Sequence, residues 1–172
     1  QQILAARPAP TCPDFSDGQT VYLWGESRRL RLEPAARGRN AFLRDQDIVL
    51  QVHPGDTPAQ RQALLNSFYR AQLDARVRAC LPYWEGKTGL HPASVQIKNM
   101  KTRWGTCNTA AKRIWLNLQL VKQPPVCLDY VLAHELTHLL HPDHGNGFWA
   151  FLLRVMPDCK AVRKALNETP FL

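Results

Sequence analysis

Residues 128–144 read LDYVLAHELTHLLHPDH, and this stretch decides the fold. It holds His134 and His138 four positions apart, with Glu135 directly after the first histidine. Residues four apart in a helix share one face, so both imidazoles can reach a single ion. Glu135 lies about 100° further round the helix, where it can take a proton from water on that ion. The pattern predicts a catalytic zinc site, because zinc makes water a nucleophile at neutral pH.

The rest of this helix, expected from about residue 127 to 140, is apolar and should be largely buried. Two histidines and a glutamate would be costly to bury without a partner. A metal ion supplies that partner, and the apolar setting therefore favours metal binding over a chance occurrence of the motif. The apolar residues around the motif are Val131, Leu132, Ala133, Leu136, Leu139 and Leu140.

A catalytic zinc usually has three protein ligands and one open position. His144 follows His138 by six residues, and His141 competes with it for the third place. On one straight helix His134 and His141 would be about 10.5 Å apart along the axis, too far to share an ion. Pro142 disfavours helical geometry at the residue before it, so the helix should end there. The chain can then turn back, and we expect His144 to be the third ligand.

Other polar residues near the motif stay open as parts of the site. Some zinc peptidases take their third ligand from a later helix, which makes Asp158 and Glu168 the acidic alternatives. A metal-bound histidine usually donates its free N–H to an acceptor, and Asp129 or Asp143 could serve. Tyr130 lies one turn before the first histidine and is interpreted mainly as a packing residue.

Composition limits the class of protein. With 172 residues, 45% hydrophobic and 21% charged, the chain is typical of a water-soluble globular domain. Its start lacks the basic and apolar regions of a signal peptide, and no apolar run could span a membrane, so we expect a cytoplasmic protein. Five cysteines without a Cys-x-x-Cys pair argue against a disulfide framework and a zinc ribbon.

The net charge of +8 leaves nucleic acid possible as a partner. No aromatic stacking pattern or recognition helix accompanies it, so we interpret the N-terminal arginines as a solvated surface. These arginines are Arg28, Arg29, Arg31, Arg37, Arg39 and Arg44.

The periodicity predicts an irregular arm over residues 1–18 and one α+β domain over residues 19–172. Strands are expected at 20–24, 28–33 and 48–52 as an antiparallel meander. Thr57, Pro58 and Gln60 form a capping box that opens a long amphipathic helix, which Pro82 should bend or close near Trp84. A strand at 94–98, a hairpin of 101–107 with 113–118, and helices near 127–140, 148–157 and 158–167 follow.

Three segments resemble the YgjP-like metallopeptidases, relatives of the SprT-like and WLM zinc peptidases. They are MKTRWGTC with IWLN at 100–107 and 114–117, LDYVLAHELTHLLHPDHGNGFW at 128–149, and VMPDC at 155–159. The chain departs from the family where Gly145 and Asn146 replace a frequent serine, and where Cys159 replaces a frequent aromatic residue. Neither departure touches the proposed chemistry.

The resemblance implies a zincin-like fold, with a small mixed or antiparallel sheet, a long backing helix and the HExxH helix. It also implies that one Zn²⁺ is held by His134, His138 and His144, with Glu135 as general base. A protein or peptide substrate would lie extended along the hairpin. Two alternatives remain: a DNA-associated protease of the SprT or WLM type, and a binding module with a structural metal. The oligomeric state does not follow from the sequence.

Overall fold

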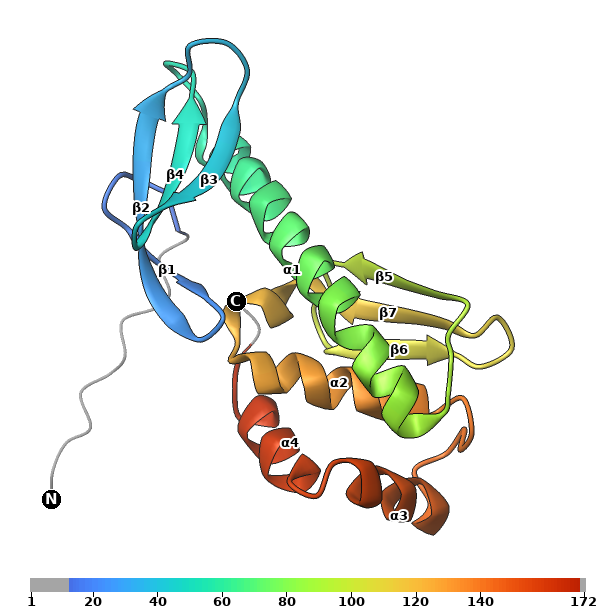
Figure 1. Cartoon of the computed structure of the whole chain (residues 1–172). Coiled ribbons are helices and arrows are strands. Elements are labelled where there is room, and N and C mark those ends of the chain that lie inside the picture. The colour runs from blue at the N-terminus through green and yellow to red at the C-terminus, as the bar shows by residue number, and fades with distance from the viewer. Residues whose placement is uncertain (1–12, 171–172) are drawn as a thin grey trace, which may run out of the picture. The chain divides into compact units, whose positions relative to one another are not determined.

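A computed structural model describes residues 13–170 of the chain and confirms the α+β class (Figure 1). The described residues form two compact units, one of residues 13–21 with 28–65, the other of residues 22–27 with 66–170. Most of the predicted N-terminal arm, residues 1–12, lies outside the described residues. Among residues 13–170 no helix is long and apolar enough to cross a membrane.

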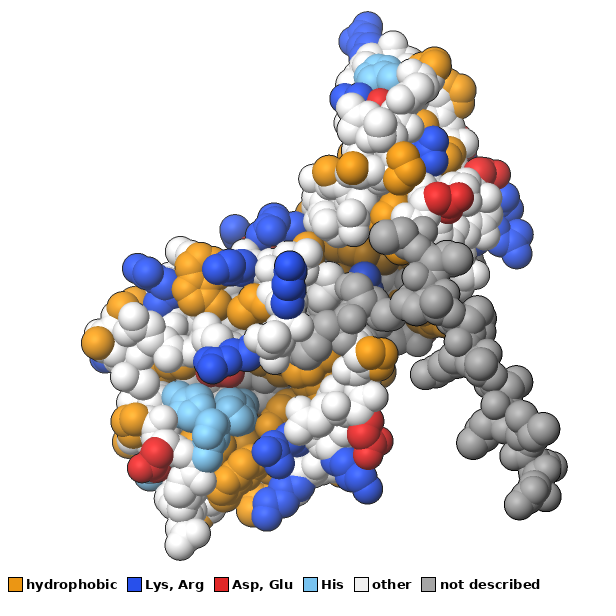
Figure 2. All heavy atoms as spheres, turned by 180° about the vertical axis from the view of Figure 1, so that it is seen from behind, with side chains coloured by type: hydrophobic (Ala, Val, Ile, Leu, Met, Phe, Trp, Pro, Cys, Tyr) orange, Lys and Arg blue, Asp and Glu red, His pale blue; other side chains and the backbone are white. Residues whose placement is uncertain are grey.

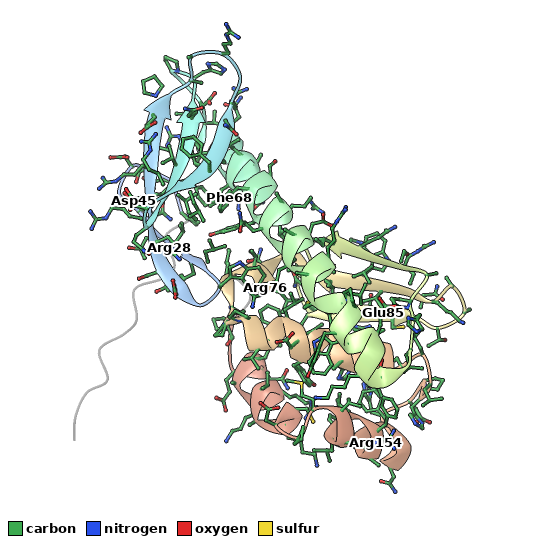
Figure 3. The ribbon with its side chains drawn as sticks, in the orientation of Figure 1. Arg28, Asp45, Phe68, Arg76, Glu85 and Arg154 are labelled. Atoms are coloured by element: carbon green, nitrogen blue, oxygen red, sulfur yellow. The ribbon has the colours of Figure 1, made fainter. Side chains whose placement is uncertain are left out.

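The first sheet differs from the predicted meander. Its strands are β1 (Thr20–Leu23), β2 (Glu26–Pro34), β3 (Asn40–Arg44) and β4 (Asp47–Val52), in the order β1-β2-β4-β3. β3 was missed, and it pairs antiparallel with β4, while β2 pairs parallel with β4. The tight turn at Asp45, which has a φ of 54°, makes β3 and β4 a local hairpin (Figure 3). That hairpin occupies one edge of β4 and leaves the other edge for β2.

Helix α1 (Pro58–Thr88) begins as predicted, because the Thr57 amide donates to Gln60 Oε1 at 2.8 Å and the Gln60 amide to Thr57 Oγ1 at 3.3 Å. Its predicted end near Trp84 is wrong by about one turn, and Pro82 lies inside the helix. In the added turn the Thr88 hydroxyl donates to the Trp84 carbonyl oxygen at 2.7 Å, and the Trp84 ring is buried with its Nε1 donating to Asp129 at 2.9 Å. Packing of this side chain outweighs the one backbone hydrogen bond that proline removes.

The second unit contains a three-stranded sheet of β5 (Ser94–Lys98), β6 (Gly105–Asn108) and β7 (Arg113–Asn117). The order is β5-β7-β6, so β6 is an edge strand. β6 and β7 form the predicted antiparallel hairpin, and β5 pairs parallel with β7. The first hairpin strand is shorter than predicted, because residues 101–104 form a loop that leads into Gly105.

Helical segments complete this unit and carry the HExxH motif. A short 3₁₀ helix, η1 (Leu118–Lys122), precedes α2 (Pro125–Thr137), α3 (Asn146–Val155) and α4 (Cys159–Asn167). Leu128, Leu132 and Leu136 of α2 are fully buried, so the apolar setting predicted for the motif is confirmed. α2 ends at Thr137, and a turn over residues 138–140 leads into the loop that contains His144.

Candidate metal centre

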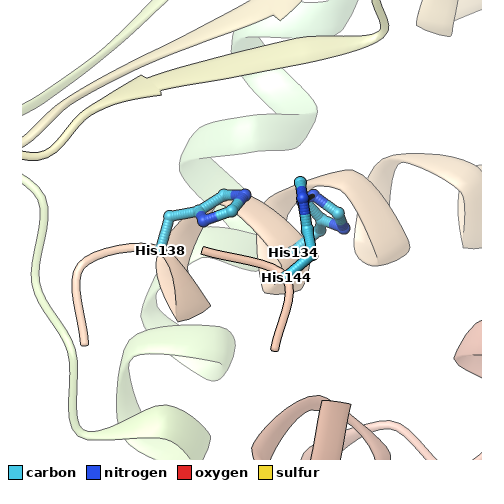
Figure 4. Close-up of side chains that lie close together, drawn as sticks. All are labelled: His134, His138 and His144. Atoms are coloured by element: carbon cyan, nitrogen blue, oxygen red, sulfur yellow. Dashed lines mark hydrogen bonds between the residues drawn. The ribbon is translucent and has the colours of Figure 1, made fainter. Parts of the chain in front are cut away.

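The three histidines expected to bind metal lie together (Figure 4). His134 lies in the last turn of α2, His138 is the C-cap of that helix, and the loop after it brings His144 against them. Their ligand nitrogens all lie within 4.8 Å of one another, and His134 Nε2 is 3.1 Å from His144 Nε2. Three nitrogens bound tetrahedrally to zinc would be about 3.4 Å apart. The donor set therefore fits a zinc ion with small shifts of the rings.

The alternative third ligands lie elsewhere. Among residues 13–170 these three histidines are the one group of His, Cys, Asp and Glu side chains close enough to share an ion. Asp158 and Glu168 are not part of it. His141 is directed away, since its Cε1 would be 2.9 Å from a Cβ placed on Gly147, and its ring lies 6.0 Å from that of Phe151.

Two neighbouring groups fix the orientation of the imidazoles. The Tyr130 hydroxyl lies 3.2 Å from His134 Nδ1, and the carbonyl oxygen of His141 lies 3.1 Å from His138 Nδ1. A histidine that binds metal through Nε2 carries its proton on Nδ1, so both Nδ1–H groups have an acceptor here. Tyr130 is also buried, so it both packs and positions a ring.

The two aspartates considered for this role have other partners, as expected of helix or loop carboxylates. Asp129 accepts the indole N–H of Trp84 and links α2 to α1. Asp143 accepts the backbone amide of Gly145 at 3.2 Å within the loop. Tyr130 could have been found from the sequence, because it precedes His134 by four residues and shares its helical face. The His141 carbonyl left no such signal, because it depends on how the loop turns.

Burial favours the neutral form of His134 and His138. The pKa of His134 is lowered to about 3, mainly by burial and to a smaller extent by the neighbouring His138 and His144 rings. Burial also lowers the pKa of His138, although its contact with the His141 carbonyl opposes this. A metal binds the neutral imidazole, so these side chains are ready as ligands at neutral pH without losing a proton.

Glu135 lies beside the three rings and is buried, with an exposed fraction of 5%. Burial raises its pKa to about 8, and the positive charge of Arg103 acts in the opposite direction. Gly105, the first residue of β6, makes room for this side chain: a Cβ there would lie 3.1 Å from Glu135 Oε1 and 2.7 Å from Val131 Cγ1. A buried carboxylate whose pKa is near neutral can both accept and release a proton.

A pocket of about 680 Å³ opens onto the site and is lined by His134, Glu135 and His144. Figure 2 shows the pale blue histidines at the surface, with blue lysine and arginine side chains on both sides of them. Gly105, Arg103 and Trp104 form part of the wall, in agreement with the expectation that the hairpin borders the cleft.

The model of the family described as YgjP-like, metallopeptidase domain, matches residues 1–169. The chain belongs to this family. The resemblance seen in the motifs is thereby confirmed, and the chain is a metallopeptidase, a hydrolase class that works with a metal ion.

Solved structures of two other metallopeptidases are similar to this YgjP-like chain. The zymogen of abylysin from Pyrococcus abyssi is 22% identical over 52% of this chain and 90% of its own, with a TM-score of 0.49. The zymogen of jannalysin from Methanocaldococcus jannaschii is 19% identical over 54% and 88%, with a TM-score of 0.48. No curated protein matches the chain.

Asn117 organises the wall of the metallopeptidase pocket and was missed in the sequence. Its side-chain amide donates to the carbonyl oxygens of Met100 and Arg103 at 3.0 and 2.8 Å. Its Oδ1 accepts the amides of Met100 and Gln119 at 3.2 and 3.0 Å. All four hydrogen-bonding positions of this buried side chain are used. A lone asparagine at the end of the apolar run IWLN was the available signal.

Proposed function

We propose that the chain is a zinc peptidase in which His134, His138 and His144 hold one catalytic ion and Glu135 is the general base. The observation that carries the proposal is the convergence of three imidazoles beside a buried glutamate, where His134, His144 and Glu135 line an open pocket. Structural zinc sites usually close with four protein ligands, whereas three ligands leave a position for water. This difference favours catalysis over a metal-stabilised binding module.

Each residue has a separate task in this proposal. When bound, zinc supplies a Lewis acid that acidifies water and polarises the scissile carbonyl. Glu135 takes the proton of the attacking water and delivers it to the leaving amine, a transfer suited to its raised pKa. Tyr130 and the His141 carbonyl hold two of the imidazoles in place.

The edge strand supports a peptide as substrate. β6 pairs with β7 on one side, and its first residue, Gly105, lines the pocket beside Glu135. An extended peptide can add its main-chain hydrogen bonds to the unpaired edge of such a strand. We propose that the substrate chain lies along β6, with its scissile bond over the three histidines.

The N-terminal arginines give little support to nucleic-acid binding. Several are paired with carboxylates of the first unit: Arg31 with Asp47 at 3.0 Å, Arg39 with Asp56 at 2.6 Å, and Arg44 with Glu33. A cation that already has a carboxylate partner contributes less to phosphate binding. Peptide hydrolysis without DNA dependence is therefore the proposal that we favour.

The test is Glu135→Gln in the zinc-loaded protein, assayed on a denatured protein substrate. We expect hydrolysis to fall by at least about a hundredfold, since general bases contribute that much, while zinc content stays the same. His144→Ala should instead reduce zinc content in elemental analysis. Hydrolysis at the parent rate by Glu135→Gln would refute the base assignment, and unchanged zinc in His144→Ala would refute the ligand set.

A further inference from the structure

Helix α4 carries two cations to the wall of the pocket. Its apolar residues Cys159, Val162 and Leu166 are buried and fix the rotation of the helix. Lys160 directly follows Cys159, and Arg163 directly follows Val162, so the two cations share a face of the helix beside the buried one. Both line the pocket. The apolar spacing of the helix thus places two positive side chains in the lining of the pocket.

Trp149 of α3 holds both side chains near the histidines. Lys160 Nζ lies 5.8 Å and Arg163 Cζ 5.3 Å from the centre of its ring, within the range of cation–π attraction. The same ring lies 6.5 Å from that of His134 and 6.4 Å from that of His144. One aromatic side chain therefore separates the two cations from the proposed ligands.

No carboxylate neutralises these cations within the described residues 13–170. Lys160 and Arg163 have no ion pair there, and Glu135 is the one acidic side chain among those that line the pocket. The pocket therefore presents unpaired positive charge on its α4 side.

We propose that Lys160 and Arg163 bind a carboxylate of the substrate, so that the site selects peptides with an acidic group near the scissile bond. The inference rests on the proposed peptidase function and names its substrate class. The carboxylate can come from an aspartate or glutamate side chain or from the C-terminus of the peptide. Arginine and lysine beside one another suit either source, because both form charge-assisted hydrogen bonds with carboxylate oxygens.

A peptide fits these observations better than a nucleic acid. Binding of single strands relies on cations spaced along a groove and on several aromatic platforms for successive bases. Here Lys160 and Arg163 share the ring of Trp149, while Arg103 and Trp104 line the same pocket from another segment. The two cations of α4 therefore lie at one place and suit a single anionic group.

Peptide binding tests the inference without depending on turnover. Fluorescence anisotropy on zinc-loaded Glu135→Gln would compare four labelled peptides. Three have an amidated C-terminus and carry glutamate, alanine or lysine at one internal position. The fourth carries alanine at that position and has a free C-terminus. We expect one of the two carboxylate peptides to bind about tenfold more tightly than the amidated alanine peptide. Which of the two does so identifies the source of the carboxylate.

Substitutions on α4 show whether the two cations are responsible. In Glu135→Gln, adding Lys160→Glu with Arg163→Glu should abolish the preference for the carboxylate and favour the lysine peptide. Lys160→Gln with Arg163→Gln should abolish it without reversal. The matched control is Lys164→Glu, which alters the charge of the same helix at an exposed position outside the pocket and should retain the preference. Circular dichroism confirms that each variant is folded.

Equal binding of all four peptides would overturn the inference, as would tighter binding of a single-stranded oligonucleotide that displaces the acidic peptide. The proposed function fails in a different way. If the unmodified zinc protein cleaves none of the peptides, while Glu135→Gln still prefers the carboxylate peptide, hydrolysis is refuted and carboxylate binding remains. Cleavage of all four at one rate, with no binding preference, refutes the acidic preference alone.

Discussion

Gly105 shows how one missing side chain can determine a reaction centre. We expect Gly105→Ala to lower the hydrolysis rate by about a hundredfold, because a shift of about 1 Å in a catalytic group has that effect. The new methyl group would meet Glu135 Oε1 at 3.1 Å and Val131 Cγ1 at 2.7 Å, so the carboxylate must move. Steady-state kinetics with zinc analysis would measure this, and zinc content should not change.

Gly86→Ala is the control for this substitution, because a Cβ on Gly86 meets nothing within 4 Å. It should hydrolyse substrate at the parent rate. An undiminished rate in Gly105→Ala would mean that Glu135 has room to move without loss, which contradicts the positioning role of the glycine.

The hydroxyl of Tyr130 should contribute to the zinc affinity of the site. Tyr130→Phe retains the buried ring of this α2 residue and removes the hydroxyl 3.2 Å from His134 Nδ1. Loss of such an acceptor typically weakens metal affinity by about 10- to 100-fold. Competition with a fluorescent chelator would measure the change in the zinc dissociation constant. An affinity equal to that of the parent protein would show that the hydroxyl does not orient the imidazole.

At the scale of elements, Asn117 connects β7 to the loop that carries Arg103. Asn117→Ala would leave the carbonyl oxygens of Met100 and Arg103 and two amides without their partner. We expect the free energy of unfolding to fall by about 3 kcal/mol, since buried groups left unpaired cost that much. Urea denaturation would measure it. Asn108→Ala, at the exposed end of β6 where the side chain accepts one hydrogen bond from the Ala111 amide, should cost less than about 1 kcal/mol.

The elements also show which features a sequence can predict. The start of α1, the β6–β7 hairpin and the HExxH helix depend on neighbours a few residues apart, and they were predicted. The parallel pairing of β2 with β4 was not predicted, because it depends on β3 occupying the other edge of β4. In the site, the three histidines could be predicted from their spacing in the sequence. The roles of Asn117 and Gly105 could not be predicted, because they depend on contacts between segments far apart in the chain.

For the whole molecule, acid should weaken the first unit. Arg39 donates two hydrogen bonds to Asp56, at 2.6 and 2.9 Å, and holds its pKa at about 2, while the amide of His53 adds a third at 2.9 Å. The pKa is lower in the folded than in the unfolded chain, where an aspartate titrates near 3.9. The ion pair therefore stabilises the fold above about pH 4, and this contribution is lost as the pH falls to about 2.

Thermal unfolding at several pH values would check this expectation. The difference in melting temperature between the parent protein and Asp56→Asn should be largest near neutral pH and should shrink below about pH 4. Asp45→Asn, at an exposed turn of the same sheet, is the matched control and should follow the parent protein at every pH. A difference independent of pH would contradict the role of the ion pair.

Metal removal is the remaining prediction for the whole molecule. An ion that binds only the folded chain stabilises it by about 2.7 kcal/mol when its free concentration is a hundred times its dissociation constant. For a chain of this size, this corresponds to about 5–10 °C in melting temperature. A chelator should therefore lower the melting temperature of the zinc-loaded protein by that amount, whereas His144→Ala should respond much less.

Hydrogen exchange would locate this effect. The histidines come from α2 and the loop before α3, so chelation should reduce amide protection there and leave the β3–β4 hairpin of the first unit unchanged. The two measurements are independent, since the melting temperature gives the size of the stabilisation by the metal and hydrogen exchange shows which segments it stabilises. An equal loss of protection in both units would mean that the ion acts on the fold as a whole, and the site would then be as much structural as catalytic.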